Sequence, residues 1–270
     1  MPDGALAAKE ERVMRKQRTR LSMFAALAIA ALTAALSVQP AKADQWLLPD
    51  LVMLQPADFQ LEKGAKGRRW LRFSTTILNI GPGRFDVYGY EPSGQSITSS
   101  SRLAVRQRLQ DTAGAFIMHY ETAAEMFFAG DGHAHWHVTD LQSWTLAFEA
   151  TPNDAVATGA KRGFCFWDNV DQLHLPKYYT GARECHLDSG TGTVPMGLSV
   201  GWGDEYPWFL DFQYIDITRL PYGNYCLSLT ADPRRDFIEA DTLNNTVRTR
   251  ISIKQGRVTV LGQGCGSAGG

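Results

Sequence analysis

Three histidines at alternate positions are the part of this chain best suited to chemistry. His133, His135 and His137 lie in the run Gly-His-Ala-His-Trp-His, and alternate side chains of an extended strand share one face. Imidazole is a preferred ligand of borderline ions such as Cu(II), Zn(II) and Ni(II). The run therefore predicts a transition-metal site, the alternative being a polar strand face that is rich in histidine.

The geometry of a strand adds a condition to this prediction. Four residues of flat strand span about 13 Å, whereas metal–nitrogen bonds are about 2.0–2.1 Å long. One ion can therefore bind all three rings only if the strand bends or bulges. Gly130 and Gly132, just before the histidines, permit such a bend.

Segments with a period of two residues dominate the chain after residue 44, and no long amphipathic helix is expected there. Loops rich in Gly, Pro, Ser and Thr are expected over 91–101 and 186–195. We expect strands over 70–80, 85–90, 133–148 (one or two strands), 214–220, 225–230, 246–253 and 257–261. This pattern predicts a mainly β protein, with a β-sandwich-like core and long functional loops in a single domain.

The N-terminal segment is typical of an export signal. Five basic residues between positions 12 and 20 precede an apolar, alanine-rich run over 21–38, and Ala41-Lys42-Ala43 matches a small-x-small cleavage site. We expect a signal peptide over 1–43, cleaved after Ala43, and a secreted or periplasmic domain over 44–270. An uncleaved membrane anchor is the alternative, because the apolar run is about long enough to span a bilayer. Cleavage would leave no stable membrane association.

The net charge argues against two kinds of anionic partner, nucleic acids and anionic membranes. Residues 44–270 carry 20 basic and 25 acidic side chains, a net charge near −5. Binding to nucleic acid or to an anionic membrane surface requires clustered positive charge. Neither partner is therefore expected.

All four cysteines lie in the part that is expected to be exported. An even number of cysteines in an oxidising compartment indicates disulfides, here two of them with three possible pairings. The pairing Cys165–Cys185 with Cys226–Cys265 is favoured because its loops are short.

Further motifs accompany the histidine run in a fixed order. They begin with Leu48-Pro49-Asp50-Leu51-Val52 and include Leu71-Arg72-Phe73, Lys161-Arg162-Gly163-Phe164-Cys165, Asp204-Glu205-Tyr206, Gln213-Tyr214-Ile215-Asp216-Ile217-Thr218 and the segment 239–245. In their order and rough spacing these segments resemble the catalytic domain of the lysyl oxidase family. The resemblance covers almost all of the chain from Leu48 to about Ile253.

The resemblance implies an activity and two cofactors. Members of the family are copper amine oxidases, which convert primary amines to aldehydes with release of ammonia and hydrogen peroxide. By resemblance His133, His135 and His137 bind copper, while Lys161 and Tyr206 form lysyl tyrosylquinone. The implied substrates are molecular oxygen and a primary amine, either a small molecule or an exposed lysine of a protein.

The chemistry explains why such a cofactor is needed. No natural side chain is a good electron sink, so amine oxidation requires a carbonyl group that can form a Schiff base with the substrate. A general base must also remove a proton from the carbon that bears the amine. Asp204 and His186 are both candidates for this base.

Carboxylate and amide side chains gather within seven residues near the C-terminal end, at Glu239, Asp241, Asn244 and Asn245. Hard oxygen ligands of this kind suit calcium rather than copper. The resemblance adds Asp50 and the carbonyl of Leu51 to this candidate calcium site, which would tie the start of the domain to its end. The alternative is a solvated acidic turn.

One departure from the family leaves two hypotheses of different classes. Trp202 and Phe212 stand where animal members have a disulfide around the quinone tyrosine. Apolar packing by Trp202, Trp208 and Phe212 is one way to hold the Tyr206 loop instead, and a looser loop that keeps Tyr206 from copper is the alternative. The first hypothesis is a copper- and quinone-dependent amine oxidase. The second is a non-catalytic copper- or zinc-binding β-sandwich module without the quinone. For the amine oxidase, collagen is not the expected substrate, because the basic residues and extra modules of animal members are absent.

Overall fold

The computed structural model describes residues 46–130 and 134–265. The expected signal peptide over 1–43 and the candidate ligand His133 lie outside the described residues. Within them the chain forms strands β1 to β18 and one short 3-10 helix, η2 (Ala65–Gly67). The described part contains no α-helix, and hence no helix that could cross a membrane. The predicted mainly β fold is confirmed.

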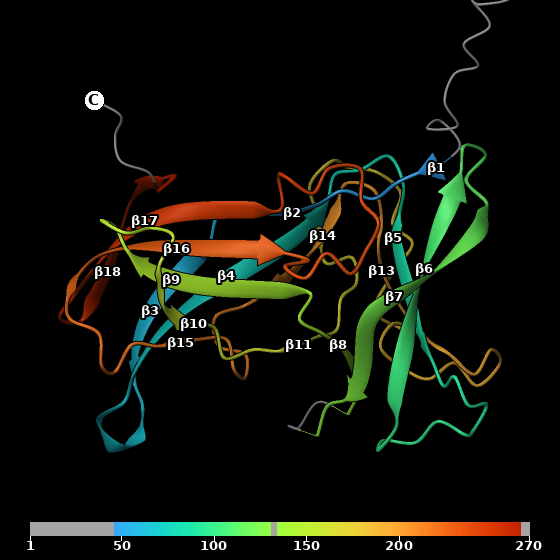
Figure 1. The fold of residues 1–270 in the computed structure, drawn as a ribbon, viewed down its shortest axis with the longest axis horizontal. Coiled ribbons are helices and arrows are strands. Elements are labelled where there is room, and N and C mark those ends of the chain that lie inside the picture. The colour runs from blue at the N-terminus through green and yellow to red at the C-terminus, as the bar shows by residue number, and fades with distance from the viewer. Residues whose placement is uncertain (1–45, 131–133, 266–270) are drawn as a thin grey trace, which may run out of the picture. The chain divides into compact units, whose positions relative to one another are not determined.

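One antiparallel sheet carries the histidine strand. Its order is β11 (Gly163–Phe164), β8 (Trp136–Thr139), β7 (Phe116–Phe128), β6 (Arg102–Asp111), β5 (Phe85–Tyr90) and β13 (Val194–Leu198), and β1 (Trp46–Leu47) pairs with β6. β6 and β7 form the long hairpin drawn in green in Figure 1. β8, the strand of His137, lies between β7 and β11.

Two further antiparallel sheets complete the fold. One has the order β10 (Ala155–Thr158), β9 (Gln142–Phe148), β16 (Gly223–Ala231), β17 (Thr246–Lys254) and β18 (Arg257–Gln263). The other is built on β4 (Arg69–Asn79), which pairs with β2 (Leu51–Met53), β3 (Ala57–Lys63), β14 (Trp202–Tyr206) and β15 (Ile215–Asp216). The two-residue strand β12 (Val170–Asp171) pairs with β14.

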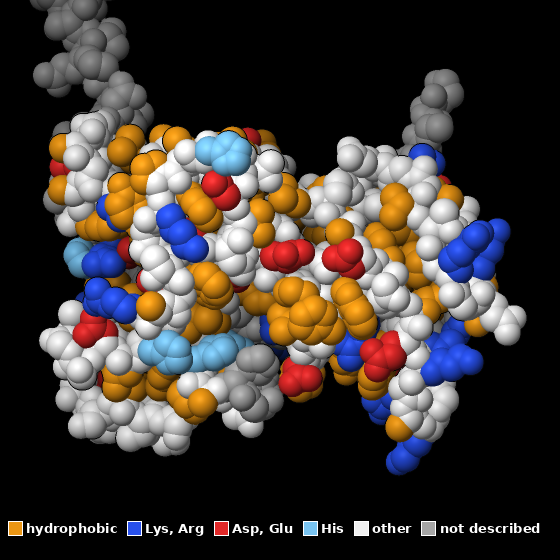
Figure 2. Space-filling model, turned by 180° about the vertical axis from the view of Figure 1, so that it is seen from behind, with side chains coloured by type: hydrophobic (Ala, Val, Ile, Leu, Met, Phe, Trp, Pro, Cys, Tyr) orange, Lys and Arg blue, Asp and Glu red, His pale blue; other side chains and the backbone are white. Residues whose placement is uncertain are grey.

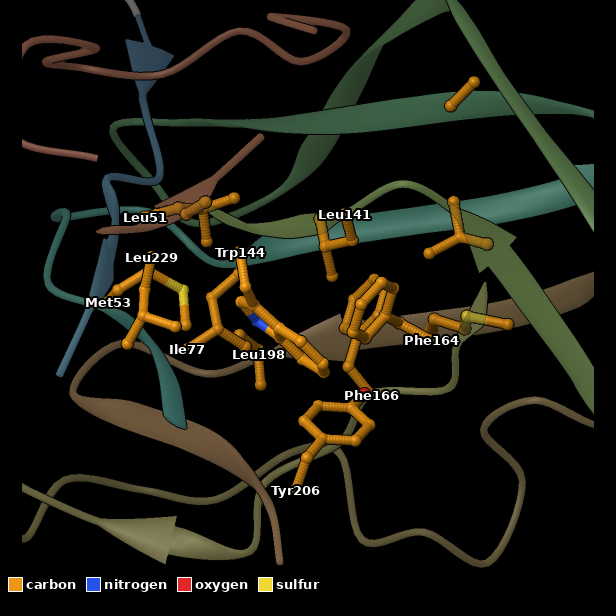
Figure 3. Packing of buried hydrophobic residues seen from close by; sticks show 14 of the residues in the cluster. Leu51, Met53, Ile77, Leu141, Trp144, Phe164, Phe166, Leu198, Tyr206 and Leu229 are labelled. Carbon is orange, nitrogen blue, oxygen red and sulfur yellow. The ribbon is translucent and has the colours of Figure 1, made fainter. Parts of the chain in front are cut away.

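The three sheets share one hydrophobic core. Phe85 of β5, Phe73 of β4 and Trp144 of β9 are all buried in the same cluster, and the rings of Phe73 and Trp144 meet edge to face with centroids 5.4 Å apart. Figure 3 shows Tyr206 at one side of the part of this cluster that contains Trp144 and Phe164. The expected quinone tyrosine therefore borders the core.

Most expected strands are present, and one is wrong. β4, β5, β16, β17 and β18 match five of the expected ranges, while 133–148 divides into β8 and β9. Of the range 214–220 only Ile215 and Asp216 are in a strand. The Asp216 carboxylate accepts a hydrogen bond from the backbone N–H of Thr218, and this local turn ends the strand.

Both favoured disulfides are confirmed. The Cα atoms of Cys165 and Cys185 are 5.7 Å apart, and those of Cys226 and Cys265 are 5.8 Å apart. The first bridge joins the residue after β11 to the loop before β13, and the second joins β16 to the residues that follow β18. Two disulfides are typical of a protein that works in an oxidising compartment.

Candidate active site

The two described histidines of the run lie against each other. His137 is within β8 and is 5% exposed, and its ring meets that of Phe127 edge to face. His135 lies in a bend just before β8, where the spacing of the three rings requires one. The two Nε2 atoms are 2.9 Å apart, which matches an N–H···N hydrogen bond. Two bonds of about 2.05 Å at a right angle to one ion would place them about 2.9 Å apart as well.

The donor set of the described residues is incomplete for a metal centre. No group of three or more His, Cys, Asp or Glu side chains within 46–130 and 134–265 could hold one ion. The third predicted ligand, His133, falls in the gap between these ranges. The ring of the exposed residue His186 lies beside that of His135, with centroids 6.1 Å apart. Histidine side chains adjoin one another in a strip on the face shown in Figure 2. Imidazole pairs of this kind fit copper and zinc alike.

Backbone hydrogen bonds fix the segment that carries Lys161. The N–H of Ala160 donates to the carbonyl of Tyr214 at 2.9 Å, and the carbonyl of Arg162 accepts from the N–H of Asp140 at 2.8 Å. Hydrogen bonds thus fix the backbone on both sides of Lys161. Its Nζ lies 5.3 Å from the centre of the Tyr206 ring.

Tyr206 approaches Lys161 from another sheet. It is the last residue of β14, opposite Thr75 of β4, and its ring packs edge to face on Phe164 with centroids 5.4 Å apart. Its hydroxyl donates a 2.6 Å hydrogen bond to the carbonyl of Cys165. Burial raises the pKa of Tyr206 well above its usual value, and the neighbouring Asp204 carboxylate adds to this effect. Tyr206 is therefore a neutral phenol whose hydroxyl is held at the Lys161 segment.

The predicted lysine, tyrosine and two of the predicted histidines line one cavity. Its volume is about 220 Å³, and its walls are formed by His135, His137, Lys161, Cys165, Trp167, Asn169, Asp204, Glu205, Tyr206 and Leu210. A second cavity of about 370 Å³ also borders Lys161 and His137 and is otherwise lined mostly by small and aromatic residues. Lys161 and His137 therefore stand between two recesses.

Polar groups of β4 hold the loop after Tyr206, and of the three apolar residues considered for this role Phe212 is largely exposed. Phe212 is 49% exposed and covers little. Instead the Arg72 guanidinium donates to the carbonyls of Trp208 and Leu210 at 3.2 and 3.0 Å. The N–H of Trp208 donates to Ser74 at 3.1 Å. These bonds tether the loop that follows Tyr206 to β4.

The expected oxygen cluster brings the two ends of the domain together. The N–H of Leu51 donates to Glu239 at 2.6 Å, and the amide of Asn244 donates to Asp50 at 2.9 Å. The amide of Asn245 donates to Glu239 at 2.8 Å. Burial raises the pKa of Glu239 to about 7.

Two orphaned atoms in this cluster point to a cation. The side-chain carbonyl oxygens of Asn244 and Asn245 are buried and accept no hydrogen bond within the described part of the chain. A buried acceptor without a donor lowers the stability of the fold, and one calcium ion can be coordinated by several such oxygens at once. Asp241 is exposed and its carboxylate accepts from the N–H of Leu243. Within the described residues Asp50, Glu239 and Asp241 do not meet as a three-carboxylate site, so the two amide oxygens are the observation that favours a cation here.

Comparison with known proteins agrees with this geometry. A family model described as lysyl oxidase matches residues 89–265, which include the histidine run, Lys161 and Tyr206. The chain belongs to the lysyl oxidase family. The match leaves out Asp50 and Leu51, so the oxygen cluster is covered only at its C-terminal half.

Individual lysyl oxidases are similar over a part of the chain. Human lysyl oxidase homolog 1 is 34% identical over 119 residues, or 44% of this chain and 19% of the relative. Human lysyl oxidase homolog 3 is 33% identical over 129 residues, or 47% and 16%. Protein-lysine 6-oxidase of Sus scrofa is 33% identical over 119 residues, or 44% of each. The aligned part thus spans less than half of the length of each of these relatives.

The structure adds two residues to the candidate site whose roles no sequence motif indicates. Asn169 donates to the Asp204 carboxylate at 2.5 Å and accepts from the N–H of Glu205 at 2.8 Å. Arg72 lies in a recognised motif, but its role depends on a contact with residues 136 positions away. No local pattern could have assigned either role.

Close packing explains why residue 163, between Lys161 and Cys165, is a glycine. A Cβ at this position would lie 2.5 Å from Cζ of Phe127 and 2.7 Å from Nδ1 of His137. Only glycine therefore lets β11 approach the histidine strand so closely.

Gly163→Ala should push β11 away from His137 and destabilise the fold by about 1–3 kcal/mol, as overpacking does. It should also weaken copper binding. Gly223→Ala in β16 is the matched control, because a Cβ there meets nothing within 4 Å. Thermal unfolding and copper titration of the two variants test this, and equal values for both would contradict it.

Proposed function

We propose that this protein is an exported, copper-dependent amine oxidase that uses a quinone formed from Lys161 and Tyr206. The observation that carries the proposal is the approach of Lys161 Nζ to within 5.3 Å of the Tyr206 ring centre, in a cavity that His135 and His137 also line. Cross-linking of a lysine to an oxidised tyrosine ring requires this proximity.

The proposed reaction balances as one primary amine, one O₂ and one water giving one aldehyde, one ammonia and one hydrogen peroxide. The quinone, when formed, supplies the carbonyl and the electron sink that side chains lack. His133, His135 and His137 are the proposed copper ligands. The described pair would hold the ion beside the cavity in which the amine is bound.

The remaining residues of the site would position the reactants. The buried rings of Tyr206 and Phe164 keep water from one wall, and the Cys165 carbonyl fixes the tyrosine hydroxyl. A cavity of about 220 Å³ suits a single alkylamine chain, so we propose as substrate a small primary amine or the exposed lysine of a protein.

We propose export as the cellular context of this activity. Residues 1–43 would act as the signal peptide and 44–270 as the mature domain, in agreement with two disulfides in that part. Copper and oxygen would then meet the protein in a secreted or periplasmic compartment.

The visible spectrum of the exported protein, loaded with copper in air, tests the proposed function. An absorbance band that shifts on addition of phenylhydrazine would support it, because hydrazines react with quinone carbonyls. A copper-loaded protein without such a band would instead be a metal-binding module without the quinone. Incubation with copper under nitrogen is the control, since quinone formation requires oxygen.

We also propose calcium at the oxygen cluster of Asp50, Leu51, Glu239, Asp241, Asn244 and Asn245. Calcium at about 100 times its Kd should stabilise the fold by about 2.7 kcal/mol, which raises the Tm by roughly 5–10 °C for a domain of this size. Calorimetry with calcium, magnesium or a chelator measures this shift.

Variants assign the calcium effect to this cluster. Asn244→Ala should remove most of the rise in Tm, whereas Asn153→Ala, at an exposed asparagine that accepts a bond from Arg248, should retain it. A calcium-dependent rise that Asn244→Ala leaves intact would contradict the assignment.

A further inference from the structure

The wall of the smaller cavity holds a buried carboxylate whose environment is unusual. Asp204 is 2% exposed and lies on β14, two residues before Tyr206. Alternate residues of a strand share a face, so Asp204 and Tyr206 reach the same cavity. Asn169 donates to Oδ1 of Asp204 at 2.5 Å.

The second oxygen of this carboxylate has no donor. Oδ2 of Asp204 is buried and makes no hydrogen bond to any residue within 46–130 and 134–265. Leaving a buried acceptor unsatisfied costs about 1–3 kcal/mol, and more when it is charged. Native proteins rarely retain such an atom without a reason, and proton transfer is one of the reasons that account for it.

The other groups of the cavity are less suited to accept a proton. Lys161 and Tyr206 would be consumed in the quinone, and His135 and His137 would bind copper. Glu205 is the second acidic residue in the lining, but it is exposed to solvent. Within the described lining Asp204 is therefore the one buried carboxylate, in a wall shared with both precursors of the quinone.

Resting on the proposed function, we propose that Oδ2 of Asp204 is the base that removes the proton from the carbon bearing the substrate amine. The carbon–hydrogen bond breaks and its proton forms an O–H bond with Oδ2. The electron pair would go to the quinone, a two-electron reduction that O₂ would reverse with formation of hydrogen peroxide. The proton on Asp204 then leaves to water.

The surroundings make Asp204 a stronger base than a surface aspartate. Burial raises the pKa of Asp204 well above its usual value, against the smaller opposing effects of the Tyr206 hydroxyl and the Lys161 ammonium. Asn169 holds the carboxylate through Oδ1, and Asp204 lines the cavity. His186, the other candidate base, is exposed and is not part of this lining.

Asp204→Asn tests the proposal with little change of shape, because the variant keeps an oxygen for Asn169. Wild type, Asp204→Asn and the exposed control Asp216→Asn are loaded with copper in air. All three should form the phenylhydrazine-reactive band in equal yield. Reduction of that band by benzylamine under nitrogen should slow by about 10²–10⁴-fold in Asp204→Asn, the range of a lost general base. It should stay within twofold of wild type in Asp216→Asn.

Chemical rescue separates proton transfer from a structural role. In Asp204→Ala, added formate should raise the rate of band reduction at least tenfold over the rate without formate. A deuterated benzylamine should show a primary isotope effect on this rate. A band that Asp204→Asn cannot form would assign this residue to building the quinone and overturn the proposal. Reduction of the band at the wild-type rate in that variant would also overturn it. Absence of the band in wild type would overturn the proposed function, and this inference with it.

Discussion

Replacing Lys161 with alanine should abolish both the phenylhydrazine-reactive band and amine oxidation while copper remains bound at the wild-type ratio. The amine of Lys161 is the atom that would join the Tyr206 ring, and it lies 5.3 Å from the ring centre. Loss of a cofactor removes the electron sink entirely, so no partial activity is expected. Copper binding should persist because the ligands are imidazoles of a different segment.

Two companion variants make this result specific. Tyr206→Phe should give the same loss, since a ring without its hydroxyl is not the precursor of the quinone. It should also cost about 0.5–1.5 kcal/mol through the lost bond to the Cys165 carbonyl. Lys177→Ala is the control, because Lys177 also lies over an aromatic ring, 5.3 Å from the centre of Trp167. Turnover that survives in Lys161→Ala would contradict the proposed cofactor.

Replacing His135 with alanine should remove copper and the quinone together. The Nε2 atoms of His135 and His137 are 2.9 Å apart, so either one alone would leave an ion with half of the described donors. Loss of a direct ligand should weaken copper binding by more than the roughly 10–100-fold that changes of outer-shell partners cause. The quinone should then fail to form, because oxidation of Tyr206 requires the bound ion and oxygen.

A histidine elsewhere provides the control for this prediction. The His174 side chain is 88% exposed and pairs with Asp171 at 3.0 Å, so His174→Ala should leave copper binding unchanged. Copper content by mass spectrometry and titration, read beside the phenylhydrazine-reactive band, checks both variants. A normal band in copper-poor His135→Ala would refute the proposed metal site.

Four residues that the sequence singles out line one cavity, whereas the sheet that carries the histidines is predicted only in part. Short local motifs contain each of these residues, so they can be recognised without knowledge of the fold. The fold then brings His135, His137, Lys161 and Tyr206 to one cavity. The hairpin of β6 and β7 was missed. Its core-facing positions include Gln107, which is fully buried and interrupts the apolar alternation.

The reason for that glutamine is visible only in the folded chain. The side chain of Gln107 both donates to the carbonyl of Ile238 and accepts from its N–H, at 2.9 and 2.8 Å. A polar residue can occupy a core position when a distant backbone satisfies it. The same argument covers Arg72, whose partners at 208 and 210 lie far along the chain. Pattern reading fails where polar groups are paired across long separations.

The Cys165–Cys185 disulfide would have to form before the proposed quinone. Cys165 is four residues from Lys161 and its carbonyl receives the Tyr206 hydroxyl, while the carbonyl of Cys185 receives the N–H of Trp136 between the two histidines. If both thiols were reduced, the Lys161 segment, the Tyr206 hydroxyl and the histidine strand would no longer be held together by this disulfide. Oxidation of the thiols would therefore precede self-processing of the tyrosine, and the newly made chain would stay an inert precursor that releases no peroxide inside the cell.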